Sequence, residues 1–252
     1  MSISLFCFPY AGAGASAYRP LASRPSAMFR VETVQYPGRE ERFQEPMYGS
    51  LAEAALDCMR QVLGSAGDET FAFFGHSFGA LVAYQTAQLL REVGETLPVH
   101  LIMSGAAGPG VPREDTGAEL ADDDELVRRV VELSGRLPEA FYNRELRSLL
   151  LLPFRADIAL HERHVPGVFD PLPVPVTTLL GARDRLVTPR QALQWAETTS
   201  MTHRLTLLPG GHMYLSDDWQ RTQATVEQTL ADSSTRPRHP AGSWGDQIRK
   251  MK

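Results

Sequence analysis

The stretch Phe71-Ala-Phe-Phe-Gly-His-Ser-Phe-Gly79 runs from a short aromatic segment into a glycine-flanked serine, and the amphipathic segment Leu81–Val93 follows it. A short, fully apolar run is typical of a buried strand, whereas apolar residues at three- and four-residue steps are typical of a helix. Gly75-His-Ser-Phe-Gly79 fits the G-x-S-x-G pattern of a strand-to-helix turn that carries a nucleophilic serine. Glycines on both sides of Ser77 relieve the crowding in so tight a turn. The stretch therefore predicts an elbow that presents Ser77 at its tip.

Short apolar runs resembling Phe71–Phe74 recur along the chain and alternate with helical patterns. The segment Leu51–Leu63 is the clearest helix, with Ser50 as its expected N-cap and Glu53 three residues on. Strands that alternate with helices imply βαβ units, because parallel neighbours need a crossover connection. We expect an α/β fold with a mostly parallel central sheet flanked by helices. The other expected strands are Ile3–Phe8, Val31–Gln35, Val99–Met103, Val176–Leu180 and Arg204–Leu208.

One part of the chain, residues 112–171, breaks this alternation. It contains helical patterns at Asp123–Leu133 and Leu146–His161 but no clear strand. It follows the fourth expected strand, where a covering segment would reach the carboxyl edge of the sheet. We therefore expect a helical lid at 112–171, although an ordinary helical excursion packed on the sheet is the alternative. The expected core is then 1–111 and 172–231, and 232–252 is expected to be a flexible polar tail.

A serine hydroxyl needs a base, and His212 is the candidate among seven histidines. It follows the sixth expected strand in a glycine-rich loop, and histidine comes last in chain order in catalytic triads built on such an elbow. Asp184 follows the fifth strand and is the candidate acid. No carboxylate lies in Met103–Pro112 after the fourth strand. Ser77, Asp184 and His212 are thus the expected catalytic residues, with a solvated turn residue as the alternative for Asp184.

Two backbone amides are expected to hold the charge of a tetrahedral intermediate. One is that of Phe78, the residue after the nucleophile. The other is that of Ala11, in the glycine- and alanine-rich turn after the first strand. Alone, that turn is a weak nucleotide-binding signal, because it lacks the lysine of a P-loop and the third spaced glycine of a dinucleotide motif.

Composition narrows the classes of partner. The 252 residues carry a formal net charge of −5, which argues against nucleic acid or an anionic membrane as the main partner. Cys7 and Cys58 lie in apolar or amphipathic runs and are expected to be buried, reduced thiols. The N-terminus has no basic start or long apolar run, and no stretch approaches the roughly 20 apolar residues of a membrane span. The chain is expected to be cytoplasmic.

Five separated motifs together resemble the type II thioesterases, the editing enzymes of polyketide and non-ribosomal peptide synthesis in the α/β-hydrolase superfamily. The resemblance covers about Leu5 to Leu230. The segment Pro37-Gly-Arg-Glu-Glu-Arg42 is the most telling, because a generic hydrolase has no reason to share it. The motifs are Phe8-Pro-Tyr-Ala-Gly-Ala-Gly14, Gln35-Tyr-Pro-Gly-Arg-Glu-Glu-Arg42, Phe74-Gly-His-Ser-Phe-Gly79, Gly181-Ala-Arg-Asp184 and Gly210-Gly-His-Met213.

The resemblance implies a substrate and a partner. The substrate is an acyl group held as a thioester on the phosphopantetheine arm of an acyl or peptidyl carrier protein, which binds transiently to a monomeric enzyme. No metal or dissociable cofactor is implied. Tyr10 stands where the family usually has His, and Arg185 where it often has Asp, so either departure is expected to tune substrate preference. Tyr10 and Met213 are expected to lie near substrate or partner.

Two readings of Arg39 and Arg42 stay open. In one, both hold a surface loop through ion pairs with Glu40 or Glu41. In the other, they contact the acidic carrier protein or support the site. Docking predicts that charge reversal at both arginines raises KM for carrier-bound substrate and spares small thioesters.

Three other functions share part of this pattern. A general serine esterase or lactonase has the same triad, and an acyltransferase passes the acyl group to an alcohol or amine instead of water. A catalytically silent module that binds carrier proteins is the third. The triad alone does not separate the first two from a thioesterase.

Overall fold

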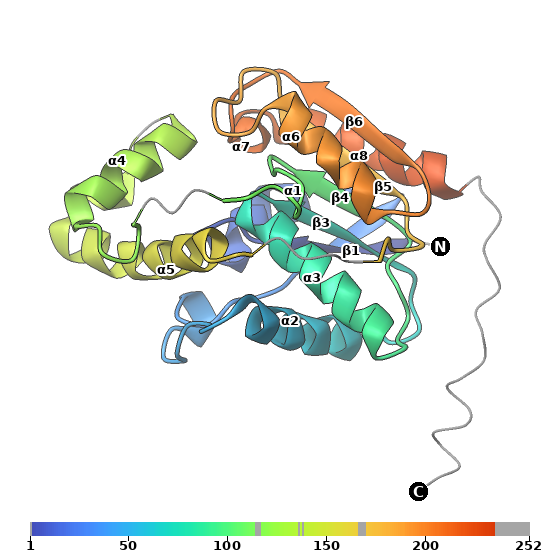
Figure 1. The fold of residues 1–252 in the computed structure, drawn as a ribbon, viewed down its shortest axis with the longest axis horizontal. Helices are drawn as coiled ribbons and strands as arrows, with labels where there is room; N and C mark the ends of the chain where they lie inside the picture. Colours follow the sequence, from blue (N-terminus) through green and yellow to red (C-terminus); the bar gives the residue numbers. More distant parts are fainter. Residues whose placement is uncertain (1, 114–116, 136, 138, 166–169, 235–252) are drawn as a thin grey trace, which may run out of the picture.

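A six-stranded sheet forms the centre of the molecule, and every neighbouring pair of strands is parallel. The computed structural model describes residues 2–113, 117–135, 137, 139–165 and 170–234. The strand order is β2-β1-β3-β4-β5-β6 (Figure 1), which confirms the expected α/β architecture. The strands are β1 (Ile3–Phe8), β2 (Phe29–Thr33), β3 (Phe71–His76), β4 (Leu101–Ser104), β5 (Val176–Gly181) and β6 (His203–Leu208).

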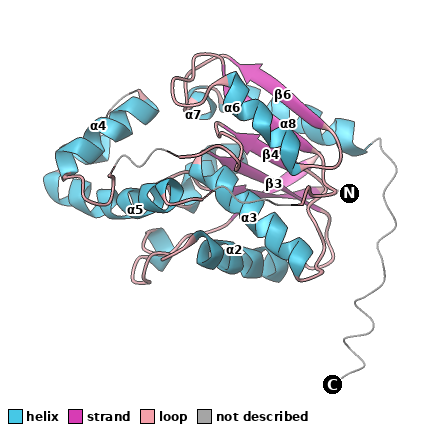
Figure 2. Ribbon diagram, in the orientation of Figure 1, coloured by secondary structure: helices cyan, strands magenta, loops and turns pink. Residues whose placement is uncertain are grey.

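Helices cover both faces of this sheet (Figure 2). On β1, Phe6 and Phe8 join the core formed with α2 and α3, whereas Leu5 and Cys7 join the core formed with α1 and α8. Burial on both faces explains why the strands read as continuous apolar runs. The helices are α1 (Arg19–Ala22), α2 (Leu51–Ala66), α3 (Phe78–Glu92), α4 (Asp123–Ser134), α5 (Arg144–Glu162), α6 (Pro189–Leu193), α7 (Tyr214–Asp217) and α8 (Trp219–Ser234), with short 3-10 turns at Ala15–Tyr18, Glu40–Arg42, Glu139–Tyr142 and Gln194–Thr198.

Several local predictions differ from the structure in detail, and the fourth strand, for example, begins at Leu101 instead of Val99. The second strand covers Phe29–Thr33 and ends before Gln35, because the Gln35 amide donates to the side chain of Gln61 instead of a neighbouring strand. Ser50 caps α2 as expected, since its Oγ accepts from the Glu53 amide at 3.1 Å. The Glu53 carboxylate, however, accepts from the amide of Gly49, so the capping box is incomplete.

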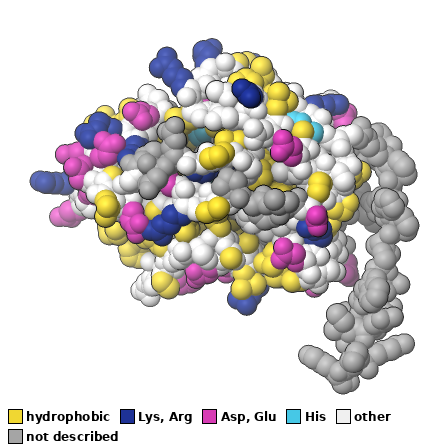
Figure 3. Space-filling view, in the orientation of Figure 1, with side chains coloured by type: hydrophobic (Ala, Val, Ile, Leu, Met, Phe, Trp, Pro, Cys, Tyr) yellow, Lys and Arg dark blue, Asp and Glu magenta, His cyan; other side chains and the backbone are white. Residues whose placement is uncertain are grey.

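Between β4 and β5 the chain forms α4 and α5, which lie beside the sheet (Figure 1). The two helices share a small apolar cluster that contains Leu126, Leu151 and Phe154. Ion pairs join them as well, among them Arg155 to Asp123 at 3.2 Å. Figure 3 shows acidic and basic side chains gathered over α4 on the displayed face. The described part of 112–171 thus contains two helices and a 3-10 turn and no strand, as its sequence pattern predicts.

The end of the core lies later than expected. Helix α8 continues to Ser234, past the predicted boundary at residue 231, and Asp232 within it pairs with Arg204 of β6 at 2.7 Å. Residues 235–252, the rest of the expected tail, lie outside the described residues. Cys7 and Cys58 are buried free thiols, as predicted. Among the residues described, no helix is both long and apolar enough to cross a membrane.

Candidate active site

Ser77 occupies the sharp turn between β3 and α3. Its backbone has φ +53° and ψ −120°, a region that residues other than glycine rarely adopt. The turn is possible only because Gly75 and Gly79, two residues before and after Ser77, have no side chain. A Cβ on Gly75 would lie 2.4 Å from the carbonyl oxygen of Gly79, and a Cβ on Gly79 would lie 2.1 Å from that of Phe8. The strained backbone therefore holds the Ser77 hydroxyl at the N-terminus of α3, where the helix dipole favours negative charge.

His212 and Asp184 are brought to this hydroxyl by the loops after β6 and β5. His212 Nε2 lies 3.1 Å from Ser77 Oγ, and His212 Nδ1 lies 2.9 Å from Asp184 Oδ2. The other oxygen of Asp184 accepts from the amides of Leu186 and Val187, which fixes the carboxylate. When the Nδ1–H group donates a hydrogen bond to Asp184, Nε2 carries no proton and can accept the proton of Ser77. The arrangement is suited to generating a serine nucleophile.

A close approach of two backbones keeps these loops together. A Cβ on Gly181, the last residue of β5, would lie 2.1 Å from the carbonyl oxygen of Gly211, the neighbour of His212. The imidazole and carboxylate side chains are almost completely buried, at 5% and 0% exposure. Water therefore competes little for the hydrogen bond between them.

The loop of residues 9–14, called here the β1 loop, lies against the elbow. Gly79 approaches the carbonyls of Phe8 and Pro9 so closely that no side chain would fit between them. Within the loop, the Ala13 amide donates to the Tyr10 carbonyl at 2.9 Å and closes a turn that contains Ala11. Neither the Ala11 nor the Phe78 amide donates to an acceptor among the described residues. Both amides are thus available for an oxyanion.

His76 lies behind the triad, close to His212. The two ring centroids are 5.1 Å apart, and His76 Nδ1 lies 2.8 Å from Ser104 Oγ, which itself lies 2.6 Å from Tyr214 OH. The edge of Tyr10 packs on the His76 ring with centroids 5.9 Å apart. Burial, assisted by the positive charge that His212 acquires, lowers the pKa of His76 well below its usual value. His76 is therefore a neutral wall of the site, and nothing in its position makes it a second base.

Arg39 is not a surface residue, and it pairs with neither Glu40 nor Glu41, so that expectation was wrong. Only 5% of it is exposed, and its guanidinium forms a two-point ion pair with Asp157 of α5 at 2.5 and 2.9 Å. Burial also removes it from any direct contact with a carrier protein. The remaining expectation, support of the site, is consistent with its position. Burial raises the pKa of Asp157, and the Arg39 guanidinium opposes that rise.

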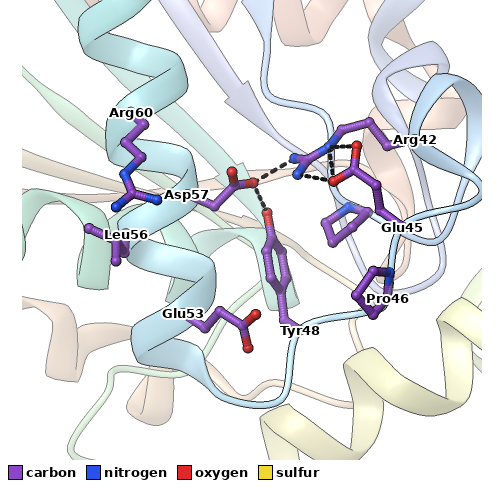
Figure 4. A pocket seen from close by; sticks show the side chains of 9 residues that line it. Arg42, Glu45, Pro46, Tyr48, Glu53, Leu56, Asp57 and Arg60 are labelled. Atoms are coloured by element: carbon purple, nitrogen blue, oxygen red, sulfur yellow. Dashed lines mark hydrogen bonds and ion pairs between the residues drawn. The ribbon is translucent and has the colours of Figure 1, made fainter.

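Arg42 likewise makes no pair with Glu40 or Glu41. Figure 4 shows its guanidinium between Glu45 and Asp57, with nitrogen–oxygen distances of 2.5 and 2.6 Å. Asp57 also accepts from the hydroxyl of Tyr48. These side chains line a small pocket between α2 and the preceding loop, and Ser77, Asp184 and His212 are not among its lining residues. The same guanidinium donates to the carbonyl of Gln35 at 2.8 Å. Arg42 therefore ties its own loop to α2.

Met213 and Asp157 are two further side chains close to the site. Met213 follows His212 directly and is the N-cap of α7, with its side chain half-buried. The sequence reading missed Asp157. One signal was present: in the helical pattern Leu146–His161, Asp157 falls three residues from both Phe154 and Leu160, so it is a carboxylate on the apolar stripe. All three side chains are buried.

A family model and several known proteins are similar in sequence to this chain along most of its length. A family model described as "Thioesterase domain" matches residues 3–232. Linear gramicidin dehydrogenase LgrE of Brevibacillus parabrevis is 32% identical over 231 residues, which cover 90% of this chain and 88% of that protein. Thioesterase PikA5 of Streptomyces venezuelae is 31% identical over 218 residues, covering 86% of this chain and 77% of that one.

A solved structure agrees with these matches in fold and in sequence. It is the RedJ thioesterase from the prodiginine biosynthetic pathway in Streptomyces coelicolor, which superimposes with a TM-score of 0.82 at 31% identity. The superposition covers 90% of this chain and 89% of that one.

Proposed function

The chain belongs to the thioesterase family, and on that premise we propose that it is a type II thioesterase that hydrolyses acyl groups from carrier proteins of polyketide or non-ribosomal peptide synthesis. The observation that carries the proposal is the hydrogen-bonded series Ser77–His212–Asp184, with distances of 3.1 and 2.9 Å. A serine and a histidine in such contact perform acyl transfer through a covalent intermediate.

The first half of the reaction forms the acyl-enzyme. His212 Nε2 takes the proton of Ser77 as Oγ attacks the thioester carbonyl, and Asp184 stabilises the resulting imidazolium. The amides of Ala11 and Phe78 donate to the oxyanion that forms. When the tetrahedral intermediate collapses, the carbon–sulfur bond breaks and His212 returns its proton to the departing thiol.

In the second half, water replaces the thiol. His212 accepts a proton from water as its oxygen attacks the acyl-enzyme carbonyl, and the same two amides hold the new oxyanion. Collapse releases the carboxylic acid and returns the proton to Ser77 Oγ. Apart from the substrate and water, the groups that act in both halves are residues of the chain.

The substrate class rests on the relatives. PikA5 is named a thioesterase, and RedJ is described as a thioesterase of prodiginine biosynthesis. We place the acyl chain and pantetheine arm between the sheet edge and the 112–171 segment, with α4 and α5 as a lid. Tyr10, which packs on His76, and Met213, beside His212, are the residues proposed to touch the acyl group. Either residue would then influence which acyl groups are accepted.

The dehydrogenase name of the Brevibacillus relative does not carry over to this chain. A nucleotide phosphate would need the free amides of a glycine-rich turn. The Gly12 amide instead donates to the carboxylate of Asp157 at 2.8 Å. The negative group already bound there would repel a phosphate, so the β1 loop is better suited to an oxyanion at Ala11 than to a dinucleotide.

The test compares the chain with its Ser77→Ala variant on acetyl-, propionyl- and longer acyl-carrier proteins and on matched p-nitrophenyl esters. We expect turnover of the carrier thioesters and loss of essentially all of it in Ser77→Ala, with unchanged circular dichroism. Cleavage of oxygen esters alone would replace the thioesterase by an esterase. Transfer of the acyl group to an added alcohol or amine in preference to water would indicate an acyltransferase. Normal turnover by folded Ser77→Ala would reject serine catalysis altogether.

A further inference from the structure

The ion pair between Arg39 and Asp157 joins the 112–171 segment to the β1 loop. We propose that this pair positions the Ala11 amide for the oxyanion, so that the lid segment supports the catalytic step as well as covering the site. The inference rests on the proposed function, because it assigns a task to the oxyanion donor of that reaction. Arg39 and Asp157 are positioning residues, since neither is proposed to touch the substrate.

The pair holds the two residues that follow Ala11. Asp157 Oδ2 accepts from the Gly12 amide at 2.8 Å, and Arg39 Nη1 donates to the Ala13 carbonyl at 3.2 Å. The same Nη1 contacts the same Oδ2 at 2.5 Å. One carboxylate oxygen and one guanidinium nitrogen therefore hold two consecutive residues of the turn. Ala11 cannot move without disturbing these contacts, because it is bonded directly to Gly12.

Helix α5 also touches the turn through packing. Gly12 has φ +76°, and a Cβ built on it would lie 2.9 Å from Cβ of Phe154. Phe154 precedes Asp157 by three residues on α5, so both side chains face the loop from one side of the helix. Ala11 packs against the apolar cluster that includes Phe154. The loop thus rests directly on the lid helix.

Other side chains of the Gln35–Arg42 motif hold the residues that follow. Gln35 Oε1 accepts from the Ala15 amide at 2.9 Å, and the Glu40 carboxylate accepts from the Ser16 amide at 3.1 Å. Gln35 also donates to the carbonyl of Arg39 at 3.2 Å. Three side chains of the motif, spread over six residues, therefore bind the segment 13–16. Holding this segment is a task that a generic hydrolase would not need in this form.

The physical consequence concerns the rate more than the binding of substrate. An oxyanion donor acts on charge that develops only in the transition state, so its misplacement lowers kcat and leaves KM nearly unchanged. Removal of such a donor costs about 100–1000-fold, and a shift of the donor by an ångström costs up to about 100-fold. A structural role alone would lower the amount of folded protein without changing kcat per folded molecule.

The experiment replaces the pair in two ways and measures kcat, KM and thermal unfolding with an acyl thioester of a small thiol. Asp157→Asn removes the charge but keeps an oxygen that can still accept from the Gly12 amide, so its kcat should fall less than that of a variant without this oxygen. Arg39→Met with Asp157→Leu removes both charges together, which leaves no unpaired buried ion and favours a folded protein. We expect kcat to fall about 10–100-fold in the double variant, with KM within about threefold of wild type. Inhibition by an acyl trifluoromethyl ketone, which leaves an oxyanion on adding to Ser77, should weaken by the same factor.

Arg42→Met is the matched control, because Arg42 belongs to the same motif but contacts no residue of the turn. Its kcat should stay within about twofold of wild type. A folded double variant with unchanged kcat would overturn the proposal, as would a change in KM alone. Ser77→Ala in the same assay separates the two hypotheses. If it is inactive while the pair variants are normal, only the positioning role fails, whereas an active Ser77→Ala removes the proposed function itself.

Discussion

The two sides of the active site are built by different means. On the sheet side, Ser77, Asp184 and His212 follow β3, β5 and β6, three parallel strands of one sheet. On the other side, the β1 loop takes its shape from Arg39 and Asp157, which come from segments outside the sheet. On the sheet side, backbone hydrogen bonds between parallel strands fix the positions of the residues. On the other side, contacts between side chains from distant segments fix them.

This difference predicts how each side responds to mutation. A residue at the end of a buried strand is held by hydrogen bonds of many neighbours, so a polar substitution there changes chemistry more than structure. The helices α4 and α5 are held together by a small apolar cluster and by ion pairs. Arg155–Asp123 and Arg147–Asp124 are partly exposed, whereas Arg129–Glu162 is more buried. Exposed ion pairs contribute little, so this pair of helices depends on a few buried side chains.

The largest effect is expected for Asp184→Asn on the sheet side. The amide nitrogen of asparagine donates where the carboxylate accepts, so His212 would carry its proton on Nε2 and could no longer accept one from Ser77. We expect kcat to fall about 10⁴-fold. The remaining amide oxygen can still accept from Leu186 and Val187, and the unfolding midpoint should change little. Steady-state kinetics with an acyl thioester give the first quantity, and Asp170→Asn, at an exposed acid, is the control. A loss below tenfold would contradict the role of Asp184.

On the side of α4 and α5, two adjacent leucines of α5 offer a sharper comparison. Leu151 is 1% exposed and packs in the cluster with Phe154, whereas Leu152 is 50% exposed. Leu151→Ala should lower the free energy of unfolding by about 2–4 kcal/mol, because it leaves a cavity. Leu152→Ala should change it by less than about 0.5 kcal/mol. Urea unfolding of both variants measures the difference. Equal, small changes would show that the cluster does not hold these two helices.

The smallest effect concerns the pH dependence of stability that buried His76 causes on the sheet side. His76 has a folded-state pKa below that of an unfolded histidine, so below about pH 6.5 the unfolded chain binds a proton that the folded chain does not. The folded state therefore loses stability relative to the unfolded chain as the pH falls below about 6.5. For a histidine that stays neutral when folded, the loss between pH 7.5 and 5.5 is about 1 kcal/mol.

Unfolding of wild type and His76→Asn at both pH values tests this prediction. The wild type should lose about 1 kcal/mol more than the variant over this interval. Parallel losses in the two proteins would show that His76 titrates normally in the folded state.

Sequence patterns anticipated the sheet side almost residue by residue. The ends of β3, β5 and β6 could be predicted to within two residues, because a buried run, a turn and a helix follow one another locally. Ser77 can be recognised by the glycines around it, and Asp184 and His212 can be recognised by the strands that precede them. Their meeting follows from the parallel sheet, which brings the carboxyl ends of its strands to one edge.

The other side was decided only by tertiary structure. Arg39 and Asp157 are 118 positions apart, and local sequence shows each only as a charged residue, one in a loop and one on a helix. Their pairing depends on where α5 lies relative to the β1 loop. The spacing of apolar residues along the chain does not specify that position. The sequence by itself determined the α/β sheet and the three residues at its edge, because local periodicity and chain order specify them. Only the packing of distant segments decided that Arg39 is buried and what it holds.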